Sequence, residues 1–416
     1  MVVLAARADP AAAMNPIAEA YVKLTLAAGV HDGDFVDAYQ GPAEWQAAAE
    51  AAKLPLAEVR RQAQALGAAL AALDATGWDE MQQLRHEYLA KQLRAMDARL
   101  ALVEGRKLPF DEESALLFDT VAPSHPPDYY DKLLAQLDRA LPGEGTLAER
   151  YQAFRNQFIV PADKLDAVFT AAINEARRRT KAHIALPENE SFTVEYVTGK
   201  PWGGYNWYKG NFHSLIQVNT DLPTFIDRAI DLAAHEGYPG HHVYNALLEK
   251  NLLRDRGWVE FSVYPLFSPQ SLIAEGTANY GIEVAFPRAE QIAFERDVLF
   301  PLAGLDPARA AEYHRVLELT KGLSFGGNEV ARSYLNGEID AEEAAKRLER
   351  YTLAEPARAR KGVSFMTKYR SYVINYNHGQ ELVRDYIEAR AHGDAGRRWK
   401  AFADLISSPR LPSTLK

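Results

Sequence analysis

The sequence predicts a mainly α-helical protein that carries one small antiparallel β-sheet. From about residue 14 to 187, apolar residues recur at helical spacing among charged ones, as in PLAEVRRQAQALGAALAAL, a pattern typical of long amphipathic helices. Between about 190 and 220 the pattern changes to strand-like alternation, in SFTVEY and FHSLIQVN, with Gly, Pro and Trp between the two runs. Helical patterning resumes near Leu222 and continues to about residue 404.

The breaks between the predicted helices indicate how the chain is organised. They fall at clusters of Pro, Gly and small polar residues such as VAPSHPPDYY and LPGEG. Helices joined by such short turns form a bundle. We therefore expect an N-terminal helical region, 1–187, followed by a region, 188–416, that holds the sheet and the C-terminal helices. A single integrated domain over 14–416 is an equally good reading.

Composition excludes several classes of function. The 416 residues include 47 Lys and Arg against 56 Asp and Glu, for a net charge of -9, so nucleic acid and anionic membranes are not expected partners. There is no cysteine, and any transition metal must therefore be bound by His and carboxylate side chains. The N-terminal apolar run lacks a basic start and is broken by Arg7 and Asp9, which predicts no secretory signal and a cytoplasmic protein.

The stretch AAHEGYPGHHVYN concentrates three of the eleven histidines. In the usual catalytic zinc helix, His-Glu-x-x-His, the imidazoles at i and i+4 share one face, and the Glu serves as general base for the attacking water. Here His235 and Glu236 are followed at i+4 by Pro239. Because Pro disrupts the helix and Gly240 permits a tight turn or bulge, a later histidine can return to the ion.

His241 is the favoured second imidazole ligand because it needs the smaller bulge, and His242 is the alternative. The one that does not bind the metal would lie beside it and support it or donate a hydrogen bond to substrate. The alternative interpretation has no metal: the stretch ends a helix, and its histidines are incidental. Three His, one Glu and a Pro-Gly pair so close together favour the metal site.

A third protein ligand is expected from Glu275. It stands in an otherwise uncharged helical run, from Ser268 to Ile282, where a lone carboxylate is unfavourable unless a cation or hydrogen bond compensates it. One turn later, Asn279 is placed to accept a hydrogen bond from a ligand imidazole.

These residues also resemble a known family. HEGYPGHH is similar to the signature of the bacterial domain of unknown function family 885, which is grouped with gluzincin-type zinc peptidases. EGTANYGIE is similar to the family's Glu-Gly-Trp-Ala and Tyr motif, with Thr277 in place of Trp and with Glu275 and Tyr280 retained. VHDGDFVDAYQGPAEW, YNWYKGNFHSLIQVNTDLP, YNHGQELVRDYIEAR and FADLISSPRLPSTL extend the resemblance from about residue 20 to the end. It implies a helical gluzincin-like fold with a deep cleft and a metallopeptidase activity.

The resemblance also points to an oxyanion donor. Its Tyr-x-x-Gly motif matches Tyr376, which could hydrogen-bond the oxyanion opposite the base, and His378 lies close enough in sequence to substitute for it. Packing by the aromatic start of a helix is the alternative reading of this segment.

Further candidates for substrate contact are less specific. In the sheet, glycines that let a backbone approach closely accompany Tyr205 and Asn206, while Trp202 and Trp207 fit cross-strand packing. Glu329 and Arg332 follow a Gly-Gly pair and could hold a substrate amine or carboxylate. Their alternative is an i,i+3 ion pair.

We therefore expect a hydrolase with one zinc ion, most simply a peptidase acting on short peptides. His235, His241 and Glu275 would bind the metal, Glu236 would act as base, and Tyr376 and His242 would assist. A metal-dependent amidase or esterase with a non-peptide substrate is the first alternative. A non-catalytic binding protein with a peptidase-like fold is the second.

Overall fold

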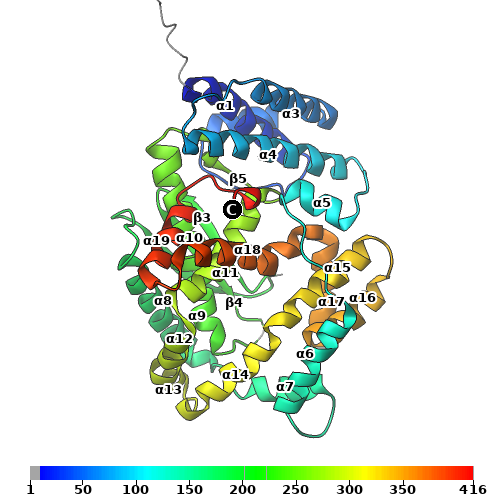
Figure 1. Cartoon of the computed structure of the whole chain (residues 1–416), viewed down its shortest axis with the longest axis vertical. Coiled ribbons are helices and arrows are strands. Elements are labelled where there is room, and N and C mark those ends of the chain that lie inside the picture. The colour runs from blue at the N-terminus through cyan, green and yellow to red at the C-terminus, as the bar shows by residue number, and fades with distance from the viewer. Residues whose placement is uncertain (1–9, 201, 222, 416) are drawn as a thin grey trace, which may run out of the picture.

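The computed structural model describes residues 10–200, 202–221 and 223–415. Residues 1–9, for which no secretory signal is predicted, and Leu222, near which helical patterning resumes, lie outside the described residues. Within them the chain is mainly helical, as predicted (Figure 1). No helix of this part of the chain is both long and apolar enough to cross a membrane.

The helices of the N-terminal half are α1 (Pro10–Gly29), α2 (Ala43–Ala52), α3 (Leu56–Ala71), α4 (Glu80–Val103), α5 (Phe110–Leu117), α6 (Pro127–Ala140), α7 (Leu147–Asn156) and α8 (Leu165–Lys181). Those of the C-terminal half are α9 (Asp227–Leu232), α10 (His241–Leu248), α11 (Pro269–Ala285), α12 (Arg288–Phe294), α13 (Phe300–Ala303), α14 (Ala310–Thr320), α15 (Phe325–Leu335), α16 (Ala341–Thr352), α17 (Pro356–Tyr369), α18 (Ile374–Ala391) and α19 (Ala395–Ile406). The strands are β1 (Val36–Tyr39), β2 (Ser191–Val197), β3 (Gly204–Gly210), β4 (His213–Asn219) and β5 (Val263–Pro265).

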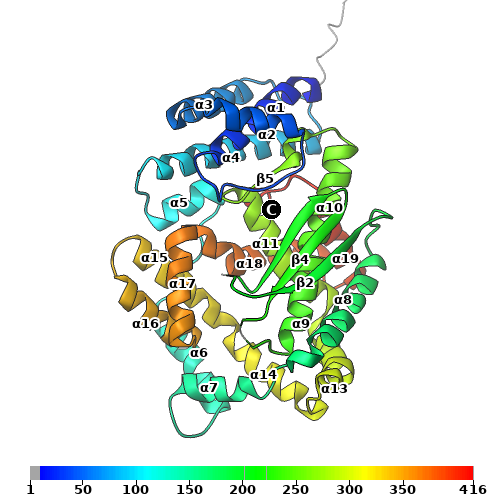
Figure 2. The same cartoon turned by 180° about the vertical axis from the view of Figure 1, so that it is seen from behind.

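The sheet expected near 190–220 is present, with the strand order β2-β4-β3. The two strand-like runs of the sequence, SFTVEY and FHSLIQVN, form β2 and β4, which pair in parallel and not antiparallel. The antiparallel pair of the sheet is β3 and β4. The chain therefore crosses from β2 to the far edge of the sheet, forms β3 there, and returns through β4. Figure 2 shows β2 and β4 from behind, beside α9 and α10. A second sheet, of β1 and β5, joins chain segments more than two hundred residues apart and has no signal in the local pattern.

The hydrophobic core consists of two large clusters of buried side chains. One gathers around α8, α10 and α14, and the other around α1, α4 and α17. Each cluster includes residues from both sides of residue 187.

α11 lies at the centre of the molecule against α18 (Figure 1). A Cβ atom at Gly276 would lie 2.5 Å from the carbonyl oxygen of Gly379, so the two backbones approach too closely for any side chain at this point. This approach brings Glu275 and Asn279 of α11 beside the start of α18.

Candidate metal site and cleft

The segment between α9 and α10 forms the interruption that the sequence predicts. After α9 the helix widens into a π-helical turn, Ala233–Gly237, in which Tyr238 N–H donates to Ala233 O at 3.0 Å. The Tyr238-Pro239 peptide bond is cis, and Gly240 N–H donates to Ala234 O at 2.9 Å. A Cβ atom on Gly240 would lie 1.9 Å from the His235 carbonyl oxygen. Only glycine fits there.

The wide turn returns His241, rather than His242, to His235. The Nε2 atoms of His235 and His241 lie 3.1 Å apart, although on a regular helix residues i and i+6 would face different sides. Both side chains are largely buried and line the same cavity.

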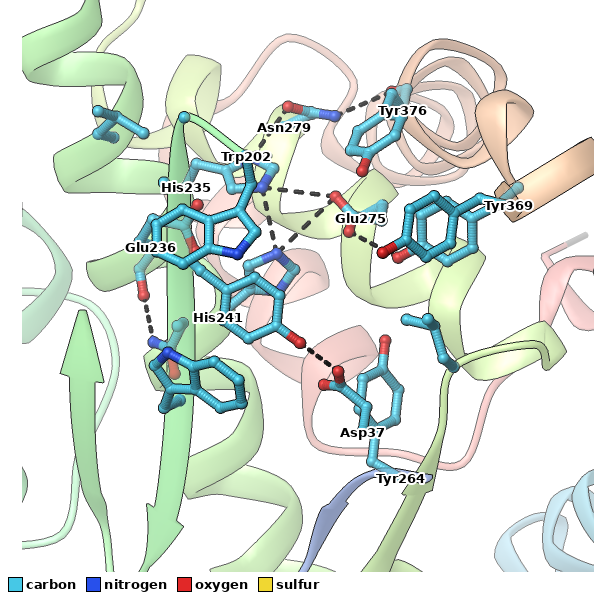
Figure 3. Close-up of a pocket in the computed structure, with 18 of the residues that line it drawn as sticks. Asp37, Trp202, His235, Glu236, His241, Tyr264, Glu275, Asn279, Tyr369 and Tyr376 are labelled. Carbon is cyan, nitrogen blue, oxygen red and sulfur yellow. Dashed lines mark hydrogen bonds and ion pairs between the residues drawn. The ribbon is translucent and has the colours of Figure 1, made fainter. Parts of the chain in front are cut away.

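Glu275 of α11 completes this group (Figure 3). Its Oε2 lies 3.4 Å from His235 Nε2 and 3.8 Å from His241 Nε2. Its Oε1 accepts a hydrogen bond of 2.9 Å from the hydroxyl of Tyr372. Oε2 is buried and has no hydrogen-bond partner within the described part of the chain. A buried carboxylate oxygen without a partner is unfavourable unless a cation compensates it.

Asn279 sets the orientation of the His235 ring, as the sequence predicts. Its Oδ1 lies 3.0 Å from His235 Nδ1, and its Nδ2 donates to the carbonyl oxygen of Tyr376 at 3.0 Å. The second bond orients the amide so that Oδ1 faces the imidazole. His235 Nδ1 must therefore carry the proton, and the lone pair of Nε2 is directed towards His241 and Glu275.

The donor set fits a transition metal. Ligand bonds of about 2.0–2.1 Å in a tetrahedron place ligand atoms about 3.3 Å apart, close to the separations of 3.1, 3.4 and 3.8 Å found here. Glu236 also offers an oxygen within 4.8 Å of the two imidazoles. Glu275 is the nearer candidate for a third ligand, because its Oε2 lies within 4 Å of both imidazoles. Glu236 then lies beside the ligands.

Glu236 is held by β3. The Asn206 side chain donates to the Glu236 carbonyl oxygen at 2.7 Å. A Cβ atom on Gly204 would lie 2.5 Å from Leu232 and 3.1 Å from the Glu236 carboxylate, so the glycine lets the strand approach the acid closely. Burial raises the pKa of Glu236 to about 7, and the nearby Glu275 charge acts in the same direction.

The site opens into a cleft of about 640 Å³. Its walls are rich in aromatic residues, among them Trp202, Tyr205, Trp207, Tyr264, Tyr369 and Tyr376. The Tyr205 ring packs in a tilted orientation against Trp202 and Trp207, with ring centroids 5.6 and 4.5 Å apart, and its hydroxyl donates to Asp37. Tyr205 and Asn206 therefore lie at the cleft. The two tryptophans line it as well as packing within the sheet.

Tyr376 lies at the cleft as expected. The residue is 38% exposed, and in Figure 3 its hydroxyl points towards Glu275. Although part of the residue is exposed, desolvation of the hydroxyl in the cleft raises its pKa well above the ordinary value, as do the charges of Glu275 and Glu236. The phenol is therefore protonated at neutral pH and can donate a hydrogen bond.

His378 does not substitute for Tyr376. It is only 7% exposed and does not line the cleft. Its Nε2 bonds with Thr120 at 3.0 Å. It lies two residues beyond Tyr376 on α18, so its side chain emerges from a different face of the helix.

His242 points into the core, and the role in substrate contact predicted for it is not compatible with this position. It is 0% exposed, its Nδ1 bonds with Ser214 at 2.8 Å, and its Nε2 bonds with Glu190 at 3.1 Å. Consecutive helical residues point about 100° apart, so His241 and His242 cannot both face the cleft. His242 instead ties the start of α10 to the sheet.

Tyr280, Glu329 and Arg332 also lie away from the cleft. Tyr280 is 2% exposed and bonds with Glu388. Arg332 Nη1 donates to Glu329 at 2.6 Å, which is the i,i+3 pair given above as the alternative. Glu329 also accepts from the backbone of His125, and Arg332 donates to a backbone carbonyl. Neither charge is available to hold the end of a substrate.

Sequence reasoning missed three side chains near the site. Tyr372 donates to Glu275, Asp37 lines the cleft, and Glu190 is the partner of His242. Tyr372 lies one turn before Tyr376, in the same aromatic stretch, which is a signal that could have suggested it. Asp37 and Glu190 lie in turn-rich segments whose pairing partners are remote, and no local pattern identifies them.

No family model and no curated protein matches this sequence. Among solved structures, the chain resembles the putative lipoprotein from Colwellia psychrerythraea with a TM-score of 0.54 and 16% identity, over 97% of this chain and 74% of that one. The putative lipoprotein of unknown function from Shewanella oneidensis gives 0.46 and 14%, over 87% and 75%. Trypanosoma cruzi metallocarboxypeptidase 1 gives 0.44 and 14%, over 96% and 90%. The first likeness shows a shared fold and nothing finer.

Proposed function

We propose that this protein is a zinc-dependent hydrolase that cleaves short peptides. The observation that carries the proposal is the convergence of His235 Nε2, His241 Nε2 and the unpartnered Glu275 Oε2 at one end of a cleft. Two imidazoles and a carboxylate are the ligands of many hydrolytic zinc sites. Resemblance to the bacterial domain of unknown function family 885 agrees with this function, and membership of that family is part of the proposal.

A zinc ion held by His235, His241 and Glu275 would supply Lewis-acid chemistry, polarising the scissile carbonyl and making a water molecule more acidic. The protein's own groups carry the proton and hold the substrate. Glu236 takes the proton of the attacking water and delivers it to the leaving amine. Tyr376 donates a hydrogen bond to the developing oxyanion.

The position of β3 favours a peptide substrate over a small ester. This strand is at the edge of its sheet, and residues 203–207 line the cleft. An edge strand offers free backbone groups that can align an extended peptide beside the metal ligands. A non-peptide amide or ester is the alternative substrate. A binding protein without turnover is the second alternative, and the position of Glu236 next to the ligand set argues against it.

The test is hydrolysis of a mixed library of short peptides by zinc-loaded protein, with products identified by mass spectrometry. Glu236→Gln should lower the rate about a thousandfold or more while zinc stays bound, because the amide cannot accept the proton. Glu329→Gln is the matched control, since that carboxylate lies outside the cleft. Absence of peptide cleavage by the parent, or equal rates in the Glu236 variant, would contradict the proposal.

A further inference from the structure

Asp37 is directed into the cleft by an irregularity of β1. Val36 pairs with Pro265 and Ala38 with Tyr264, so Asp37 is an extra residue with no counterpart on β5. Such a bulge redirects a side chain, and bulges are frequent beside active sites. In Figure 3, Asp37 lies near Tyr264, on the opposite side of the metal-ligand group from Asn279 and Tyr376.

Within the described residues, the Asp37 carboxylate has one hydrogen-bond partner. The Tyr205 hydroxyl donates to its Oδ1, which leaves most of the acceptor capacity of the carboxylate unused. Burial raises the pKa of Asp37 to about 6. The group is therefore mostly ionised at pH 7, in a place where a bare charge is unfavourable.

Asp37 is also unlike the other charges of the cleft. Lys368 Nζ lies 3.0 Å from Asp34 Oδ1, and Arg228 pairs with Asp231. These four side chains line the cleft, and their charges cancel in pairs. Glu236 and Glu275 belong to the metal site. Within the described part of the chain no cation pairs with Asp37, so the cleft holds one negative charge without a protein counter-ion.

We propose that Asp37 binds a protonated primary amine of the substrate and thereby makes the cleft selective for amine-bearing peptides. This proposal rests on the function proposed above, because it gives the substrate class of the same site. An ammonium group would donate a charge-assisted hydrogen bond to the free carboxylate oxygens. The α-amine of a peptide and the side chain of a lysine share this chemistry.

Binding can be measured separately from cleavage in the Glu236→Gln protein loaded with zinc. The probes are Phe-Ala-Ala, its N-acetylated form, and N-acetyl-Lys-Ala-Ala, titrated calorimetrically at pH 7. We expect the acetylated peptide to bind about tenfold or more weakly than Phe-Ala-Ala, the range for loss of a hydrogen bond to a charged group. Tight binding of N-acetyl-Lys-Ala-Ala would assign the amine to a side chain, and weak binding would assign it to the α-amine.

The same titrations are repeated on the Glu236→Gln protein that also carries Asp37→Asn. This substitution should abolish the preference for the amine and change the affinity of N-acetyl-Phe-Ala-Ala less than twofold. Asp34→Asn is the matched control, because it removes an equal charge from the same cleft but from a pair with Lys368. It should keep the preference.

Equal binding of all three probes to the protein with Asp37 intact would overturn the inference, even if Asp37→Asn fails to fold. A preference that survives in Asp37→Asn would overturn it as well. Neither result bears on whether the parent cleaves peptides, which the hydrolysis assay measures on its own.

Discussion

His241 and His242 are neighbours in the sequence but belong to two clusters, which differ in whether the buried carboxylate has hydrogen-bond partners for both of its oxygens. His241 meets His235 and Glu275 at the cleft, where the Glu275 Oε2 has no hydrogen-bond partner in the described residues. His242 meets Glu190 in the core, and that carboxylate also accepts from Tyr238 at 2.5 Å, from Arg177 at 2.8 Å and from Lys181 at 3.2 Å.

The difference teaches how to tell a ligand set from a structural network. Both clusters bury a carboxylate beside an imidazole, so residue type and burial do not separate them. In the Glu190 cluster every charge has a partner, whereas the Glu275 cluster leaves one buried carboxylate oxygen without one, which the proposed zinc ion would compensate. Substitutions in the first should therefore change stability, and substitutions in the second should change metal binding.

The largest effect expected is the contrast between His241→Ala and His242→Ala. Loss of His241 removes one of three ligands, and we expect zinc affinity to fall about a thousandfold. Loss of His242 should change zinc affinity less than tenfold and lower the midpoint of thermal unfolding instead. Competition with a chromophoric chelator measures the affinities. An equal loss of zinc in the two variants would break the distinction between the clusters.

A smaller effect is expected at Asn279, which contacts the ligand His235 and not the metal. Asn279→Ala removes the acceptor of the Nδ1 proton, so zinc affinity should fall by about ten- to a hundredfold. Asn279→Asp should recover part of the loss, since a carboxylate accepts the same proton. The same competition assay applies, and unchanged affinity in Asn279→Ala would show that the ring is oriented by other contacts.

The smallest effect is expected in the Glu190 cluster, on the stability of the fold. Burial alone would raise the pKa of Glu190, but hydrogen bonds from His242, Tyr238, Arg177 and Lys181 lower it to about 2. Because this value lies below the ordinary 4.5 of the unfolded chain, the ionised group stabilises the fold above about pH 4.5. That contribution disappears as the pH falls towards 2.

Glu190→Gln should accordingly lower the free energy of unfolding by about 2 kcal/mol at pH 7. The difference from the parent should shrink between pH 4.5 and 2 in urea titrations. Glu188→Gln, an exposed neighbour on the same turn, is the control and should change nothing. A difference that stays constant down to pH 2 would mean that Glu190 acts through packing and not through its charge.

The sequence predicts the helical class and the sheet because both depend on local periodicity. It also predicts Asn279 beside His235. Asn279 follows the expected ligand Glu275 by four residues, and helical geometry places residues i and i+4 on one face. It does not predict where His242 goes, since that depends on Glu190 from a distant turn. Glu329 and Arg332 form the i,i+3 ion pair that their spacing offered as the alternative to a substrate contact. Asp37 reaches the cleft through a bulge against a strand more than two hundred residues away.

The most direct test of the central claim is the zinc content of the full chain, purified without chelator and then titrated with zinc. The ligand set of His235, His241 and Glu275 predicts one equivalent per chain, retained after dialysis and lost in Glu275→Ala. Less than about half an equivalent after purification, with none regained on addition of zinc, would contradict it.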